Sequence, residues 1–262
     1  DRVEILSGVF EGFTTGAPIC MLIWNKDSDS RSYEEIISKP RPGHSDYPAK
    51  VKYSGYADYR GGGRFSGRLT ASFIMAGAVA QKLLYSTLGI EITAYTVQIG
   101  QIKANEIDLE NAKKNRYAND VRCPDLTAAD KMREIILQTK REGDSLGGVI
   151  ECICTGLPVG LGEPIFSSLE SDISKAVFSI PAVKAIEFGS GFLGSEKKGS
   201  ENNDLFTIKN NKIVTKTNNA GGILGGLSNG MPIKMRIGFK PASSISRTQS
   251  TIDLSSLSEV DI

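Results

Sequence analysis

Apolar residues recur along the chain with the two spacings that distinguish strands from helices. Alternation and short apolar runs predict two strands around a turn within residues 2–24, and single strands over 93–102, 148–154 and 233–239. Spacings of three and four predict helices over 66–84, 126–140 and 169–178, the second of them entered through Asp125. This mixture predicts an α/β or α+β fold, in which helices pack on a sheet.

Residues 38–65 follow neither spacing. They contain three prolines and the glycine run 61–63. We therefore expect a long loop, and loops of this length in compact domains are usually functional or disordered.

A short segment recurs along the sequence. Residues 8–19 match residues 148–159 at a constant offset (148 − 8 = 140), and residues 222–233 share the frame Gly, Val or Ile, six residues, Gly-x-Pro. The frame predicts a strand that ends in a glycine turn, after which proline restarts an extended segment. The repeat indicates an internal duplication, with related halves at about 1–140 and 141–262.

Composition and charge narrow the class of protein. With 31 Lys plus Arg against 30 Asp plus Glu, the 262 residues carry a formal charge of +1, which argues against nucleic-acid binding over the whole surface. The longest apolar run, residues 19–24, is too short to span a bilayer, so no membrane protein is expected. The 28 glycines exceed the usual share of roughly 7% and favour tight hairpins and phosphate-binding loops.

Cysteine and histidine are scarce. Of the four cysteines only Cys152 and Cys154 are close in sequence, on one face of a predicted strand, where they cannot easily form a disulfide with each other. With one histidine in the sequence, neither a Cys/His zinc site nor any other metal site is expected. We expect four buried, reduced thiols in a cytoplasmic protein.

Cations gather at both ends of the long loop. The segment RPGHSDY (41–47) opens it, and RGGGRFSGR (60–68) leads into the predicted helix, where Arg64 and Arg68 would share one face. No carboxylate side chain occurs between Asp58 and Glu91. A glycine-rich loop with arginines before a helix favours phosphate or carboxylate binding. The alternatives are neutralisation by distant acidic residues or simple exposure to solvent, and without a G-K-[ST] sequence this is no P-loop.

His44 is the only histidine, and it lies between Arg41 and Asp46. A lone histidine is commonly a surface or structural residue, but this position favours general acid–base work. A Ser-His-Asp hydrolase would need a nucleophile elbow, which the sequence lacks.

A second glycine-rich segment, residues 218–230, precedes KPASS (240–244). Paired glycines let backbone N–H groups approach a planar or phosphorylated ligand, and Lys240 with Ser243 and Ser244 could hold a phosphate. The same residues could equally form a plain β-hairpin.

Together, five segments (41–47, 61–68, 179–189, 218–230 and 240–244) resemble chorismate synthase, collinearly from residue 1 to about 253. The resemblance implies a single domain over 1–262 with a β-α-β sandwich fold, in a homotetramer, which suits two related halves. It implies conversion of 5-enolpyruvylshikimate 3-phosphate to chorismate and phosphate by a 1,4-elimination that needs reduced FMN, although the reaction is redox-neutral overall.

The resemblance also implies roles for individual residues. His44 matches the family's proton donor to reduced flavin, and Arg41 and Arg68 match substrate-binding arginines. The positions that match flavin contacts are Arg64, Phe65, Ser66, Pro181, Ala182, Gly225, Lys240, Pro241, Ala242, Ser243 and Ser244. A substrate with one phosphate and two carboxylates, beside an FMN phosphate, would explain cations without local carboxylates.

The sequence departs from the family pattern in places. Phe65, Leu69 and Ala185 stand where Ser, Glu and Gly are common, which puts fine flavin contacts in doubt. The family's Gly-Glu-Ser-His-Gly and Arg-His-Asp segments would lie before Asp1 and after Ile262, so we expect a chain truncated at both ends and inactive alone. Whether the enzyme reduces its own flavin with NADPH stays open.

Two alternatives remain. One is a non-catalytic remnant of the fold. The other is a single-stranded nucleic-acid-binding module, because residues 41–68 interleave cations with aromatic residues.

Overall fold

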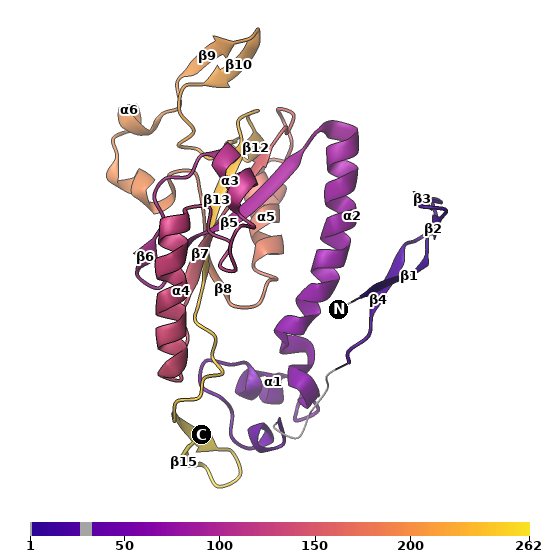
Figure 1. Cartoon of the computed structure of the whole chain (residues 1–262), viewed down its shortest axis with the longest axis vertical. Helices are drawn as coiled ribbons and strands as arrows, with labels where there is room; N and C mark the ends of the chain where they lie inside the picture. The colour runs from indigo at the N-terminus through magenta and orange to yellow at the C-terminus, as the bar shows by residue number, and fades with distance from the viewer. Residues whose placement is uncertain (1, 27–32) are drawn as a thin grey trace. The chain divides into compact units, whose positions relative to one another are not determined.

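The computed structural model describes residues 2–26 and 33–262. The chain divides into two compact units (Figure 1). Unit 1 comprises residues 1–80 and 248–262, and unit 2 comprises residues 81–247. Helix α2 (Thr70–Leu88) runs from one unit into the other. Helices and strands both contribute, as the sequence predicts. None of the described helices combines the length and apolarity needed to cross a membrane.

Unit 2 is built on a five-stranded antiparallel sheet. The order is β6-β5-β7-β13-β8, from Ile102–Lys103, Glu91–Ile99, Gly148–Thr155, Ile233–Phe239 and Val183–Phe188. Strand β13 pairs on both edges, so that Ile237 lies opposite Ile150 of β7 and Ile186 of β8. The predicted strands over 93–102, 148–154 and 233–239 are confirmed within a few residues.

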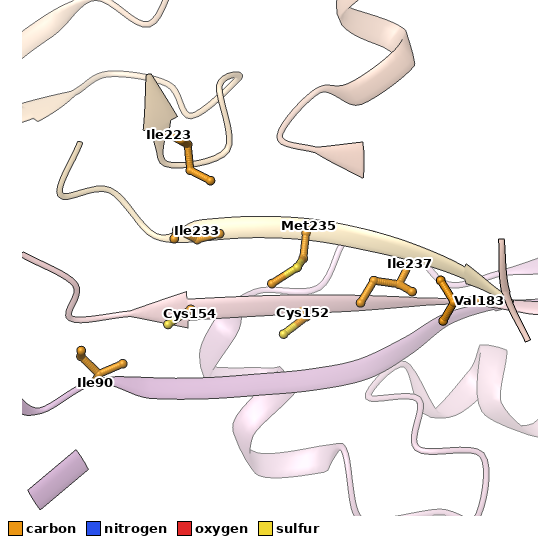
Figure 2. Close-up of a cluster of buried hydrophobic side chains, with 8 residues drawn as sticks. All are labelled: Ile90, Cys152, Cys154, Val183, Ile223, Ile233, Met235 and Ile237. Atoms are coloured by element: carbon orange, nitrogen blue, oxygen red, sulfur yellow. The ribbon is translucent and has the colours of Figure 1, made fainter. Parts of the chain in front are cut away.

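Alternation of side chains along these strands gives the sheet two faces with different coverings. On one face, buried residues of β7 and β13 pack with Ile173 and its neighbours on α5 (Leu169–Val177), as Figure 2 shows for the sheet residues. On the other face, Tyr95 and Ile153 pack with Ala112 of α3 (Leu109–Asn115). A third cluster centres on Met132 of α4 (Leu126–Arg141).

Side-chain caps fix where the helices of unit 2 begin. The Asp125 carboxylate accepts from the Ala128 N–H at 3.0 Å, which confirms the predicted start of α4. Ser168 caps α5 in the same way, through the Ser171 N–H at 3.2 Å. The rest of unit 2 is short: 3₁₀ segments Ile165–Ser167 (η5) and Gly191–Glu196 (η6), helix α6 (Gly199–Asn202), and hairpins β9–β10 (Phe206–Lys209, Lys212–Thr215) and β11–β12 (Ile223–Leu224, Leu227–Ser228).

Unit 1 contains small elements. Strands β1 (Val3–Ser7) and β4 (Cys20–Ile23) pair and enclose the hairpin β2–β3 (Val9–Phe10, Phe13–Thr14). The hairpin β14–β15 comes from Ser250–Asp253 and Ser258–Asp261. Between them in sequence lie α1 (Asp46–Lys52) and the 3₁₀ segments η2 (Glu35–Ile37), η3 (Arg60–Phe65) and η4 (Gly67–Leu69).

Two predictions in this region are wrong. Residues 38–65 are not one loop, because α1 forms within them; Pro48 lies in its first turn, where a missing N–H costs little. The next α-helix begins at Thr70, not at residue 66, because the Ser66 hydroxyl accepts from the Arg68 N–H at 3.2 Å and holds a 3₁₀ turn. Arg64 and Arg68 therefore do not share one face of an α-helix.

The recurring segment adopts one structure twice. Residues 8–19 and 222–233 each form a hairpin whose two turn residues have positive φ: Glu11 and Gly12, then Gly225 and Gly226. Residues 148–159 differ, since β7 runs straight through to Thr155. The reason is local: Cys152 occupies the place of the second turn glycine. The predicted duplication into halves 1–140 and 141–262 stays a prediction.

The thiols differ in exposure. Cys123, Cys152 and Cys154 are buried, whereas Cys20 on β4 is exposed, so the prediction of four buried thiols is wrong at Cys20. All four are free thiols. Burial raises the pKa of Cys152 and of Cys154 to about 11.

Candidate active site

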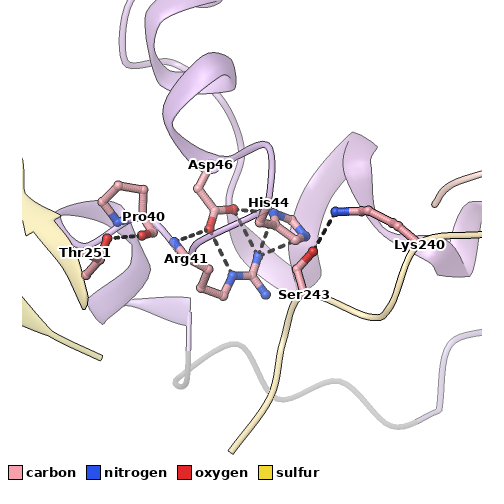
Figure 3. A network of polar contacts seen from close by, with 7 residues as sticks. All are labelled: Pro40, Arg41, His44, Asp46, Lys240, Ser243 and Thr251. Carbon is pink, nitrogen blue, oxygen red and sulfur yellow. Dashed lines mark hydrogen bonds and ion pairs between the residues drawn. The ribbon is translucent and has the colours of Figure 1, made fainter. Parts of the chain in front are cut away.

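The histidine of the first motif is held by a carboxylate two residues later. His44 Nδ1 lies 2.7 Å from Asp46 Oδ1, and the same carboxylate accepts from Arg41 Nε at 2.9 Å (Figure 3). Side-chain exposure is 23% for His44, 16% for Arg41 and 14% for Asp46, so solvent screens these contacts only in part. The structure thus brings Arg41 and His44 together, with Asp46 as their common partner.

Backbone contacts of unit 1 hold this motif in place. The His44 N–H donates to the Arg41 carbonyl at 3.2 Å, which closes a turn just before α1. The Thr251 hydroxyl on β14 donates to the Pro40 carbonyl, also drawn in Figure 3. The motif is therefore tied to a hairpin more than 200 residues later in the sequence.

Electrostatics keep Asp46 ionised. Burial acts to raise its pKa, but hydrogen bonds from His44 and Arg41 outweigh burial and hold the pKa of the Asp46 carboxyl well below its usual range. An anion is therefore fixed beside the His44 ring throughout the physiological pH range.

A cavity of about 220 Å³ in unit 1 joins the two halves of the arginine-rich region. Arg41 and Asp46 line it from the first motif, and Gly62 and Phe65 line it from the second. The remaining lining is mainly aromatic and aliphatic, including Tyr33, Tyr56 and Tyr59. An apolar cavity with a few charged groups at its wall is typical of a small-molecule site.

The arginines of the second motif differ in their partners. Arg60 pairs with Asp58 at 2.8 Å, and these hydrogen bonds lower the pKa of Asp58 to about 2. Among residues 2–26 and 33–262, neither Arg64 nor Arg68 has a carboxylate within ion-pair distance, and both are exposed. Distant acidic residues of the described chain thus do not neutralise these two arginines.

In unit 2, two of the predicted segments meet. The Lys240 N–H donates to the Ala182 carbonyl at 2.9 Å, so Pro181 and Ala182 lie beside the start of the segment 240–244. Lys240 Nζ donates to Ser243 Oγ at 2.7 Å, as Figure 3 shows. The Ser145 hydroxyl fixes the same segment through the Ala242 carbonyl at 2.7 Å. The result is a half-buried ammonium and hydroxyl pair after β13.

Gly225 is not brought to this segment within the chain. It is the first turn residue of the β11–β12 hairpin, which precedes β13, whereas Lys240 follows β13. A strand rises about 3.3 Å per residue, so the seven residues of β13 span roughly 23 Å. Gly225 and Lys240 therefore mark opposite ends of that strand.

Sequence reasoning missed Asp204, which organises the start of the second glycine-rich segment. Its carboxylate accepts from the Thr217 hydroxyl at 2.6 Å and from the N–H groups of Asn219 and Ala220, both at 2.8 Å. Burial acts to raise its pKa, but these hydrogen bonds outweigh burial and lower it. No local motif marks Asp204, because its partners lie 13 to 16 residues later.

A polar row across the sheet of unit 2 was also missed. Buried Glu151 accepts from the Tyr95 hydroxyl at 2.5 Å and pairs with Lys234 at 3.2 Å. On the neighbouring strands Arg236 pairs with Glu187 at 2.5 Å. Each carboxylate in the row has a cation beside it, so the row acts as a structural network.

Comparisons with known proteins show the family to which the chain belongs. The family model described as chorismate synthase matches residues 1–262. The chain is 53% identical to chorismate synthase of Dehalococcoides mccartyi over 262 residues and 55% identical to that of Korarchaeum cryptofilum, in each case over all of this chain and 72% of the relative. The relative from Pyrococcus abyssi is 52% identical over 264 residues, with the same coverage.

A solved structure is similar as well. A crystal structure of chorismate synthase covers 92% of this chain and 72% of its own length, with a TM-score of 0.78 and 32% sequence identity. The family model covers every segment discussed above, from the His44 turn to the residues after β13. On this evidence the chain belongs to the chorismate synthase family.

Proposed function

We propose that the protein converts 5-enolpyruvylshikimate 3-phosphate to chorismate and phosphate by a 1,4-elimination that requires reduced FMN. The observation that carries the proposal is the contact of His44 with Asp46 beside Arg41. It places a proton-carrying ring next to a cation at the wall of a cavity that also reaches Phe65. Membership of the chorismate synthase family supports the reaction class.

The substrate is a polyanion with one phosphate and two carboxylates, and unit 1 offers cations for it. Arg41 and Arg68 are the proposed substrate ligands. Because Arg68 has no carboxylate partner in the described chain, its charge remains available for an incoming anion. A cation beside the departing phosphate would also stabilise the charge that develops there.

The residues of the chain also suit FMN. An ammonium next to a hydroxyl, Lys240 with Ser243, matches the donor set that a phosphate prefers. When bound, reduced FMN supplies electron density that assists departure of the substrate phosphate. The residues proposed to hold it are Arg64, Phe65, Ser66, Pro181, Ala182, Gly225, Lys240, Pro241, Ala242, Ser243 and Ser244.

His44 is the proposed proton donor to the reduced flavin. Its Nδ1 faces Asp46 Oδ1 at 2.7 Å, so Nε2 is the nitrogen left to hold and deliver the proton. We further propose a cytoplasmic homotetramer that binds neither nucleic acid nor membranes. Sedimentation of the purified enzyme would test the tetramer.

The test of the function is anaerobic turnover with chemically reduced FMN. The full-length enzyme should form chorismate and release one phosphate for each molecule formed, and oxidised FMN should support neither. His44→Ala should lower turnover by about 10²–10⁴-fold, the usual contribution of a general acid or base. Its melting temperature should change little because His44 is only partly buried. No turnover by the parent enzyme would overturn the reaction, and normal turnover by His44→Ala would remove the histidine from it.

A further inference from the structure

We propose that Asp46 is a positioning residue that acts through His44, by fixing which ring nitrogen carries the proton. The inference rests on the proposed role of His44 as proton donor. No part of it requires Asp46 to touch substrate or flavin.

The Asp46 carboxylate is held from four directions. Asp46 Oδ1 accepts hydrogen bonds from His44 Nδ1 at 2.7 Å and from Arg41 Nη2 at 3.0 Å. Asp46 Oδ2 accepts from the Arg41 backbone N–H at 3.0 Å and from Arg41 Nε at 2.9 Å. Asp46 is also the first residue of α1, where the positive end of the helix favours an anion. The carboxylate can therefore neither rotate away from His44 nor readily lose its charge.

Arg41 cannot take over this role. Its Nη2 lies 3.1 Å from His44 Nδ1 and 3.3 Å from Nε2, so it is nearly equidistant from the two ring nitrogens. The lone pairs of the two nitrogens lie in the ring plane and point apart, so one donor cannot align with both. The guanidinium consequently does not choose between the tautomers.

The carboxylate does choose. Ionised Asp46 can only accept hydrogen bonds, so the His44 nitrogen facing it must carry a hydrogen. Neutral His44 then has its hydrogen on Nδ1 and its lone pair on Nε2. Among the described residues of unit 1, the charged groups that contact the ring are Asp46 and Arg41, of opposite sign.

Asp46→Asn tests this directly, since the amide keeps the size of the side chain but loses its charge and can donate as well as accept. Turnover should fall by at least about tenfold and by no more than the loss in His44→Ala, because that loss bounds what His44 supplies.

The double variant Asp46→Asn/His44→Ala separates action through His44 from independent action. If Asp46 acts through His44, the double variant should be no slower than His44→Ala within about a factor of two. Multiplied losses would overturn the proposal. The matched control is Asp120→Asn, which removes the exposed carboxylate–arginine pair Asp120–Arg133 of unit 2 and should retain normal turnover.

A second readout does not depend on activity. His44 is the only histidine in the sequence, so ring-nitrogen NMR of ¹⁵N-histidine enzyme, with the His44→Ala spectrum subtracted, isolates its signals. We expect protonated Nδ1 in the parent and a mixture of tautomers in Asp46→Asn. A parent spectrum in which the neutral ring carries its hydrogen on Nε2 would overturn the positioning proposal even if turnover is normal. The expected spectrum together with normal turnover by His44→Ala would instead overturn the catalytic role of the histidine.

Discussion

The backbone of Gly63 passes so close to Asp58 that a Cβ at Gly63 would lie 2.0 Å from the Asp58 carbonyl oxygen. Gly63 has φ 53° and ψ −139°, a conformation that is almost confined to glycine. The loop between the Asp58–Arg60 ion pair and Arg64 therefore has its present course only because residue 63 lacks a side chain.

Gly63→Ala should displace the segment 64–68 and weaken substrate binding. Its melting temperature should change little. The clash and the strained backbone together prevent the native loop, while the rest of unit 1 can persist. Calorimetric titration with substrate would measure the loss. Gly67→Ala is the matched control, because a Cβ there meets nothing within 4 Å and φ is not positive. Equal affinities in the two variants would contradict the role of the loop.

Arg68→Ala should weaken substrate binding by about ten- to a hundredfold, since a charge-assisted hydrogen bond contributes about 1.5–3 kcal/mol. Lys82→Ala on α2 removes an exposed cation outside the candidate site and should change affinity little. If Arg68→Ala instead raises thermal stability with unchanged affinity, Arg68 was only an unfavourable charge near the start of α2.

Gly225→Asn should separate ligand binding from folding. A Cβ at Gly225 meets nothing within 4 Å, and the corresponding position of the first hairpin is occupied by Glu11 with φ 47°. Asparagine tolerates positive φ, so the melting temperature should stay within about 2 °C of the parent. The affinity for reduced FMN, measured by absorbance, should fall. Unchanged affinity would remove Gly225 from the flavin contacts.

Gly226→Asn provides the contrast for that experiment. Its Cβ would lie 2.7 Å from Ser168 Cβ, next to the cap of α5. This variant should lower the melting temperature clearly, which would show that the assay detects damage to the hairpin.

Only one thiol should react quickly with a disulfide reagent at pH 8. With a pKa of about 11, Cys152 and Cys154 are thiolates in about one part per thousand at that pH, and burial also blocks access. Exposed Cys20 should account for the fast phase, and Cys20→Ser should abolish it. Two or more fast thiols in the native protein would contradict the buried positions.

The sequence predicts best those elements in which the spacing of apolar residues matches the face that is buried in the structure, or in which a capping residue marks the start of a helix. Strand β13 alternates buried and partly buried residues from Ile233 onward, and α4 begins at its capping residue Asp125, so both were placed within a residue. Helix α1 was missed because seven residues are too few to establish a period. The hairpin β9–β10 was missed as well, and its exposed Phe206 and Ile213 give no core-facing pattern.

For the candidate site, residue types were easier to predict than their partners. The cluster of Arg41, His44 and Asp46 is contiguous in sequence, so its chemistry could be predicted locally. Other contacts join residues that are distant in sequence, and no local pattern encodes them. These are the hydrogen bond from Thr251 to Pro40 and the hydrogen bonds that Asp204 accepts from the glycine-rich segment.

The twin hairpins have a consequence for the order of folding. Each closes between residues seven apart, Thr15 with Gly8 and Asn229 with Gly222, and hairpins of this size form in about 1–10 μs. The sheet of unit 2 instead joins distant segments, such as Ile92 with Cys154, and such pairings form slowly. The hairpin that ends at Ile233 can therefore close before β13 pairs with β7 and β8 on its two edges. Early closure would fix the start of β13 and so limit the registers that β7 and β8 can adopt against it.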